Sequence, residues 1–395
     1  MKANTRAICL AALCCLTFST ACTVSRGNPV AASSWVPKAA ASYLDNRTTW
    51  WMGWSGAARD HGTFCISCHT ALPYALARPA LRPVLAEQGL STNELKILDN
   101  VIKRVRLWNQ IGPYYSDPGY GGRVTESRGT EAVLNALVLA SYDSPAGNLG
   151  ADTRTALRNM WEVQQTSGDK AGAWPWLQFD QEPWEANDSA YYGACLAAMA
   201  VGLAPGNYAG SPEAQNGLKL LLDYLQRESA SQSPINRVFL LWASTKLPEL
   251  LSREQQNAII QEVLSRQQAD GGWRLASMAW RWKGWSVTAL LRMWFLGDGT
   301  PLAHKSDGVA TGLVAFVLEE AGVPSENIQL RRGLSWLMSN QNTAEGFWPA
   351  WSINRRKSTT SNTGRFMSDA ATAYAVLALT AHKTPEAPVA AAAHY

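Results

Sequence analysis

Five consecutive residues, Cys65-Ile66-Ser67-Cys68-His69, form a Cys-x-x-Cys-His string. Two thiols at this spacing can each add to one of the two vinyl groups on one edge of a haem. The histidine that follows is then placed under the iron as an axial ligand. The string therefore predicts covalently bound haem c, with Cys65 and Cys68 as anchors and His69 as a ligand of the iron.

Three other interpretations of this string stay open. Cys65 and Cys68 form a disulfide or redox pair in the first, which an oxidising compartment allows. The two thiols and a histidine bind zinc in the second, although the adjacent Cys68 and His69 make poor joint ligands. The third is that the string arose by chance.

A second ligand of the iron would decide between two kinds of chemistry. An open position favours O₂ or peroxide chemistry, and a filled one favours electron transfer. His61 is the candidate nearest in sequence. The other candidates are Met278, His304 and Met367, and then His382 and His394 near the end of the chain.

The first 21 residues have the features of a secretory signal peptide. Lys2 and Arg6 precede an apolar run over residues 7–18, and small residues precede Cys22. This end also resembles a bacterial lipoprotein signal, in which the cysteine after the cleavage site is lipidated, although Ser19 stands where a Leu-like residue is usual. We expect an exported protein of the bacterial periplasm, or one that Cys22 anchors to the outer membrane.

The composition is that of a globular chain with a substantial core. Of the 395 residues 47% are hydrophobic and 17% are charged. The 18 tryptophans suit core packing or the lining of a pocket for a bulky apolar ligand. The net charge is +4 without a basic stripe, so no nucleic-acid partner is expected. After the signal, no apolar segment reaches the length of about 18 residues that predicts a transmembrane helix.

Beyond an irregular segment at residues 30–90, which carries the haem motif, a unit of three parts recurs. An amphipathic helix ends near a glutamine, a Gly-aromatic turn follows, and an almost wholly apolar helix comes next. Helices with one apolar stripe belong outside, and helices that are apolar all round are buried, so a ring would place the second set inside. Amphipathic helices are expected to begin near Ser91, Asp152, Ser211, Ser252 and Ser325, and apolar segments to cover 130–140, 189–201, 235–243 and 369–381.

The alternation is unclear between residues 273 and 305, and residues 383–395 are expected to form a disordered tail. Runs with the period-two pattern of strands are missing from the sequence. The predicted class is therefore all-α.

Three short segments resemble the Gln-Trp repeats of squalene cyclases. They are Gln164-Gln165 with Gly172-Ala173-Trp174, Gln267-Gln268-Ala269-Asp270-Gly271-Gly272-Trp273, and Asn340-Gln341 with Gly346-Phe347-Trp348. In that family the glutamine caps a helix end and the tryptophan stacks nearby, which ties outer helices together. The resemblance covers residues 91–382 and implies an α/α toroid, the double ring of helices that squalene–hopene cyclases and protein prenyltransferases share. The string around Cys65 resembles a group of exported bacterial proteins in which Cys-x-x-Cys-His precedes such repeats.

The catalytic acids of that family do not carry over. Squalene–hopene cyclases protonate their substrate with the middle Asp of Asp-x-Asp-Asp-Thr-Ala. The nearest match is residues 368–373, where Ala370 and Ala371 replace two acids and Asp369 is out of register. Cyclisation by that route is not expected. Protein prenyltransferases hold zinc with an Asp, a Cys and a His, and Cys195 is the only cysteine in the repeats.

Acidic residues recur where apolar helices begin: Glu131, Asp188, Asp307 and Asp369. Helix capping and compensation of the helix dipole explain this placement in general. The alternative is a site at one mouth of the ring, for which Asp307 and Asp369 are the best catalytic candidates.

The first functional hypothesis is a haem-dependent oxidoreductase whose ring binds a hydrophobic, isoprenoid-like molecule. The second is a non-catalytic electron-transfer or scaffold module with a redox partner protein. The third is a terpenoid cyclase or isomerase in which the Cys-x-x-Cys-His string has a structural role.

Overall fold

The computed structural model describes residues 34–117, 119, 122–179, 181–186, 188–279, 305–353 and 357–381. The predicted signal peptide, Cys22, His304 and the predicted tail, together with His382 and His394, lie outside these ranges. Most of the segment in which the alternation is unclear lies outside them as well.

Helices dominate the described residues, which confirms the all-α class. The one strand pair among them is short and antiparallel, β1 (Ala58–Arg59) with β2 (Thr63–Phe64). No described helix has the length and apolar character needed to cross a membrane. The helices are α1 (Pro37–Gly53), α2 (Ala71–Leu85), α3 (Thr92–Arg106), α4 (Val124–Asp143), α5 (Ala151–Glu162), α6 (Ser189–Leu203), α7 (Pro212–Glu228), α8 (Pro234–Lys246), α9 (Arg253–Leu264), α10 (Leu275–Ala279), α12 (Gly308–Glu320), α13 (Ile328–Ser339) and α14 (Phe366–Ala381).

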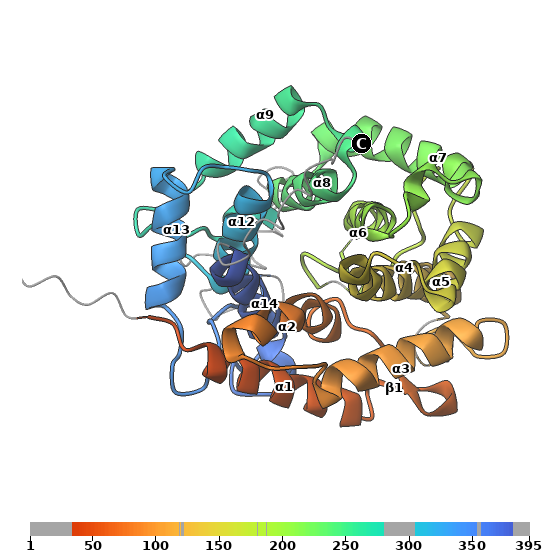
Figure 1. Ribbon diagram of the computed structural model, residues 1–395, viewed down its shortest axis with the longest axis horizontal. Helices are drawn as coiled ribbons and strands as arrows, with labels where there is room; N and C mark the ends of the chain where they lie inside the picture. Colours follow the sequence, from red (N-terminus) through yellow and green to blue (C-terminus); the bar gives the residue numbers. More distant parts are fainter. Residues whose placement is uncertain are drawn as a thin grey trace, which may run out of the picture.

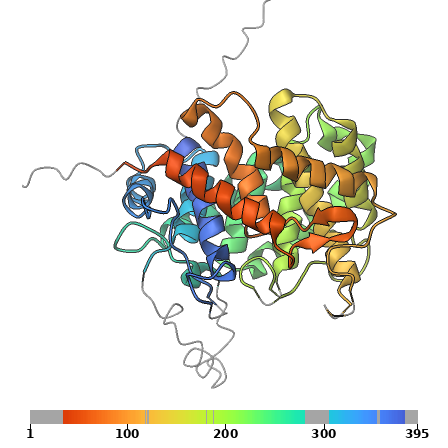
Figure 2. The same cartoon turned by 90° about the horizontal axis from the view of Figure 1, so that it is seen from below.

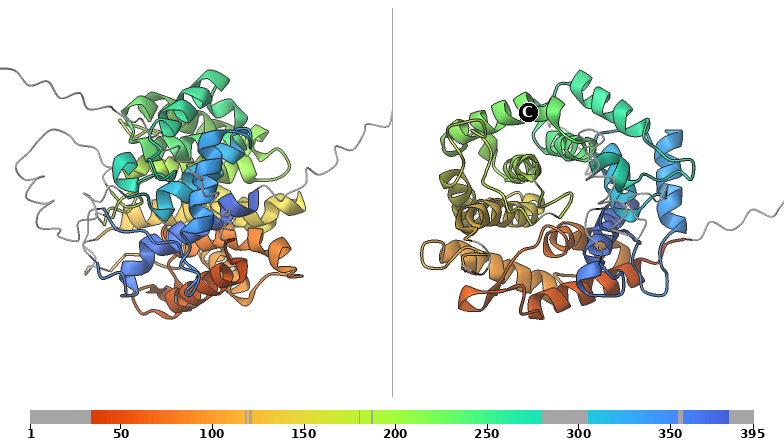
Figure 3. Two further views of the ribbon diagram at one scale, coloured as in Figure 1. Left: turned by 90° about the vertical axis from the view of Figure 1, so that its left-hand side faces the viewer. Right: turned by 180° about the vertical axis from the view of Figure 1, so that it is seen from behind.

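The long helices form an inner and an outer layer (Figure 1). Helices α6, α12 and α14 are buried almost all round, whereas α3, α5, α7 and α13 bury one stripe. In the inner layer each helix packs on the next, in the order α2, α4, α6, α8, α12 and α14, and α14 packs on α2. The inner layer therefore closes on itself, and Figure 3 shows the same order from behind.

The segment expected to be irregular before residue 90 contains two long helices, so that part of the prediction is wrong. Helix α1 lies on the outside (Figure 2), and it buries Ala40, Leu44 and Trp51, which share one helical face. Helix α2 joins the inner layer and tolerates Pro79 and Pro83 within it. The many Trp and Pro residues before residue 90 make this segment look irregular in sequence. The positions that it buries nevertheless have helical spacing. The boundary expected at residue 90 falls in the loop between α2 and α3.

Local capping signals place several helix ends correctly. Ser91 with Glu94 and Ser252 with Gln255 each form a complete capping box, at the starts of α3 and α9. Ser211 is the N-cap residue of α7, as expected, but its side chain makes no capping hydrogen bond.

Three glutamines tie neighbouring outer helices together. The Nε2 atom of each donates to a carbonyl of its own turn and to a second carbonyl at the next outer helix. The acceptors are Gly172 and Gly217 for Gln164, Gly271 and Gln329 for Gln267, and Gly346 and Val36 for Gln341, at 2.6–3.3 Å. Val36 is the N-cap residue of α1. Gln341 therefore joins the end of α13, the last outer helix, to the start of α1, the first one.

A fully buried tryptophan follows each of these glutamines. Its indole Nε1 donates to a carbonyl near the end of the preceding outer helix, in the pairs Trp174–Met160, Trp273–Val263 and Trp348–Leu337. The turn before the third tryptophan needs glycine. Gly346 has a φ of 88°, and a Cβ atom there would lie 2.0 Å from the carbonyl oxygen of Ala39.

Candidate functional site

The Cys-x-x-Cys-His string lies between strand β2 and the start of the inner helix α2. Ser67 Oγ accepts hydrogen bonds from the backbone N–H groups of Thr70 and Ala71, at 3.2 and 3.0 Å, and so caps α2. Trp51 Nε1 donates to the carbonyl of Cys65 at 2.7 Å. These contacts fix the string at the N-terminal end of a helix in the inner layer.

Both thiols of the string are free and buried. Cys65 and Cys68 are 3% and 1% exposed, and no disulfide joins them. Tyr115 Oη donates a hydrogen bond to Cys65 Sγ at 3.8 Å. Burial raises the pKa of Cys65 to about 11 and raises that of Cys68 well above its ordinary value, so both thiols are neutral. The structure therefore has two free thiols at this spacing, which the haem interpretation requires and a disulfide would exclude.

The zinc interpretation finds no support in the geometry. Within the part of the chain that the structure describes, no three His, Cys, Asp or Glu side chains gather in a way that could hold a metal ion. Haem has a different requirement, because the protein needs to supply only one or two ligands to its iron.

His69 is enclosed by aromatic rings. It is 5% exposed, the Phe366 ring stacks on it at a centroid distance of 3.8 Å, and Trp51 meets it edge-on at 5.2 Å. Burial, together with the cations Lys357 and Arg47, holds the pKa of His69 well below its ordinary value. The imidazole is therefore neutral, the form that can bind a metal.

The hydroxyl group of Thr70 determines which nitrogen of His69 carries the proton. Thr70 Oγ1 donates its hydrogen to Asp369 Oδ2 at 2.8 Å and lies 2.9 Å from His69 Nδ1. Because the hydroxyl has a single hydrogen, its oxygen accepts from Nδ1–H. Nε2 is then the nitrogen without a proton, and no described residue makes a hydrogen bond with it.

Asp369 is held from three sides. Arg47 donates from Nε to Oδ1 and from Nη2 to Oδ2, at 2.7 and 2.9 Å, and Tyr43 Oη donates to Oδ1 at 2.8 Å. Burial raises the pKa of Asp369, while the bonds from Arg47, Thr70 and Tyr43 oppose that rise. Since Arg47 is always charged and contacts both oxygens, Asp369 is an ionised carboxylate in a buried bidentate pair.

The two predicted catalytic acids have different surroundings. Asp369 is linked to His69 through the hydroxyl of Thr70. Asp307 caps α12: it accepts from the N–H groups of Ala310 and Leu275, at 3.0 and 2.6 Å. Burial raises the pKa of Asp307 to about 6. The contacts of Asp307 are thus those of a helix cap, and the buried Glu131 pairs with Arg104.

The candidates for a second iron ligand lie in different places. His61 is in the turn between β1 and β2, where its ring is 48% exposed and pairs with Asp60 at 2.8 Å. Met278 is buried in α10. Met367 is buried in α14 directly after Phe366, the residue that stacks on His69.

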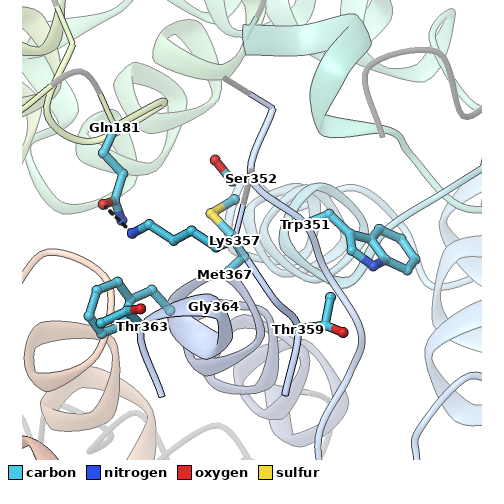
Figure 4. A pocket seen from close by; sticks show the side chains of 9 residues that line it. Gln181, Trp351, Ser352, Lys357, Thr359, Thr363, Gly364 and Met367 are labelled. Carbon is cyan, nitrogen blue, oxygen red and sulfur yellow. Dashed lines mark hydrogen bonds between the residues drawn. The ribbon is translucent and has the colours of Figure 1, made fainter. Parts of the chain in front are cut away.

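A pocket opens beside Phe366 (Figure 4). Gln181, Lys357 and Met367 are among its lining residues, and Lys357 Nζ lies 3.3 Å from Gln181 Oε1. The same ammonium lies 4.8 Å from the centre of the Phe366 ring. Of the described candidates, Met367 is thus the one that adjoins the surroundings of His69.

Several site residues carry too weak a signal to be found from the sequence. Thr70 directly follows His69, so its proximity could have been noted. Phe366 comes from a segment far from the string, and Arg47, although it lies in the preceding helix α1, is 322 residues from its partner Asp369. Only the closure of the helix layers brings them together.

The chain matches no protein-family model and no curated protein.

Proposed function

We propose that this is an exported c-type haem protein, in which Cys65 and Cys68 hold the haem covalently and His69 Nε2 binds its iron. The observation that carries the proposal is the combination of two free thiols at the attachment spacing with a neutral histidine whose Nδ1 is already bonded. That donor set fits haem c. When bound, the haem supplies redox chemistry at iron.

The protein's own residues prepare this ligand. Thr70 and Asp369 keep the proton on Nδ1, and Phe366 and Trp51 fix the ring and exclude water from it. Because both thiols are buried in the folded chain, attachment must precede the final packing of the segment between β2 and α2.

The helix layers support a toroid of the terpenoid-cyclase type as part of the proposal. The closed order of the inner helices and the three Gln–Trp units are the features expected of such a ring. The signal-like first 21 residues and Cys22 support placement in the periplasm or at the outer membrane, where haem c can be attached.

Electron transfer to a redox partner protein is better supported than chemistry on a ring-bound hydrophobic molecule. The Phe239 ring of α8 contacts both Tyr192 of α6 and Tyr374 of α14, at centroid distances of 4.7 and 6.4 Å. Since α12 separates α8 from α14 in the inner layer, these aromatic contacts reach across the inside of the ring and occupy part of it.

A cyclase or isomerase function is supported less well. An acid that starts cyclisation must be free to give its proton to an apolar substrate. Asp369 is ionised against Arg47, and Asp307 accepts two backbone hydrogen bonds. Neither group is arranged as such an acid.

Covalent attachment can be tested with the full chain expressed alongside the c-haem maturation machinery. Wild-type protein and a Cys195→Ala variant, which removes a buried cysteine of α6, should keep haem through a denaturing gel stained for haem peroxidase activity. The double variant Cys65→Ala/Cys68→Ala should lose the stained band. A band of equal strength in the double variant would refute attachment through these cysteines.

A further inference from the structure

The hydroxyl of Thr70 is not needed to begin helix α2. Thr70 is the N-cap residue, yet its side chain makes no capping hydrogen bond, because Ser67 Oγ accepts from the first N–H groups instead. The hydroxyl is thereby left to bridge His69 and Asp369, at 2.9 and 2.8 Å. Since Ser67 caps the helix, the geometry points to a role for the Thr70 hydroxyl in holding His69.

The Asp369 carboxylate, which accepts the hydrogen bond from Thr70, is fixed in position and kept ionised by its neighbours. Arg47 contacts both of its oxygens, and it also donates to the side chain and the carbonyl of Asn362, at 2.9 and 2.7 Å. Tyr43 supplies a further hydrogen bond. With its charge shared among these donors, Asp369 can polarise Nδ1–H through Thr70 without removing the proton.

We infer that Thr70 and Asp369 are positioning residues that set how strongly His69 donates electrons to the haem iron, and that Arg47 and Tyr43 limit this effect by holding the Asp369 charge. The inference rests on the proposed function. A hydrogen bond from the distant ring nitrogen to a carboxylate raises the basicity of a metal-binding histidine, and a more basic ligand favours the oxidised iron.

The test compares midpoint potentials of the haem-loaded full chain by spectroelectrochemistry. Thr70→Val keeps the shape of the side chain but removes the hydroxyl, so its potential should shift to a more positive value. Thr70→Ser restores the hydroxyl and should return the potential towards that of the wild type. Thr380→Val is the matched control, because within the described ranges the Thr380 hydroxyl bonds to carbonyls of its own helix, α14, alone.

A potential in Thr70→Val equal to that of wild type and of Thr380→Val would overturn the inference. So would a shift that Thr70→Ser shares in full, because the hydroxyl would then not be its cause.

A second measurement does not depend on haem. In the full chain without haem, ¹⁵N NMR of the labelled histidine rings should show the proton of His69 on Nδ1 in the wild type and a mixture of the two tautomers in Thr70→Val. A wild-type His69 with its proton on Nε2 would overturn the inference. If the wild-type chain takes up no haem but shows this Nδ1–H tautomer, the proposed function fails while the hydrogen-bond bridge stands.

Discussion

Asp369 and His69 are joined through one hydroxyl group, since Thr70 Oγ1 lies 2.8 Å from Asp369 Oδ2 and 2.9 Å from His69 Nδ1. The two residues come from opposite ends of the chain. Helix α14, which carries Asp369, packs on helix α2, which begins directly after the Cys-x-x-Cys-His string. The site therefore exists only when the inner layer has closed.

Replacing Arg47 with Met should destabilise the protein strongly. The change leaves the Asp369 carboxylate, whose side chain is 1% exposed, without its charged partner, and such losses are about 3–5 kcal/mol. Arg106→Met is the matched control, because Arg106 pairs with Asp152 at the surface with a side chain that is 67% exposed, and its loss should be much smaller. Free energies of unfolding in denaturant measure both, and equal losses would contradict the buried pair.

Gln341 should be important for joining the two ends of the outer layer. Its side chain exchanges hydrogen bonds with both backbone groups of Val36 and donates to the carbonyl of Gly346. Gln341→Ala leaves these partly buried groups without their partner, so we expect a loss of about 1–2 kcal/mol and faster amide exchange in α1. Gln226→Ala, at an exposed position of α7, should change stability by less than about 0.5 kcal/mol. Unchanged amide exchange in α1 of the Gln341→Ala variant would show that the hydrogen bonds between Gln341 and Val36 are unimportant.

Gly346 should tolerate no side chain. Alanine there must adopt a φ near 88° with its Cβ atom against the Ala39 carbonyl, so a loss of at least about 2 kcal/mol is expected. Gly53→Ala, where no atom lies within 4 Å of the added Cβ, is the control and should be neutral or slightly stabilising. Thermal unfolding of the two variants side by side measures the difference, and similar melting temperatures would speak against a close approach at this turn.

Burial of Asp307 should make stability depend on pH. Its pKa is raised from 3.8 to about 6 in the folded chain, so the folded state holds this proton more tightly than the unfolded state. The contribution is fully present below pH 3.8 and is lost as the pH rises to about 6, by about 3 kcal/mol at most. The unfolding free energy of Asp307→Asn, measured across this range, should lack that decline. An identical pH profile in the variant would contradict the raised pKa.

Features that depend on neighbouring residues could be predicted from the sequence. The capping boxes at Ser91 and Ser252 mark true helix starts, because the residues that satisfy the first N–H groups lie within the same turn. The glutamine and tryptophan of each repeated turn likewise lie close to the carbonyls they bind in their own turn and preceding helix. The Cys-x-x-Cys-His string is equally local in sequence, and the haem that its spacing predicts stays a prediction.

Features that depend on how the inner helices pack on one another could not be predicted in this way. Helix α1 fills the place of an outer helix beside α13, and nothing local reveals that Gln341 reaches Val36, 305 residues away. Asp369 could be singled out as an acid at the start of an apolar helix. Its partners Arg47 and Tyr43 could not, because only tertiary packing sets them against it.

The most direct test of the central claim is the visible spectrum of the full chain, exported and purified from cells that carry the c-haem maturation machinery. The proposal predicts one haem per chain, with the absorption bands of haem c that persist after denaturation and acid–acetone extraction. Correctly exported protein with Cys65 and Cys68 intact but without any haem band would contradict it.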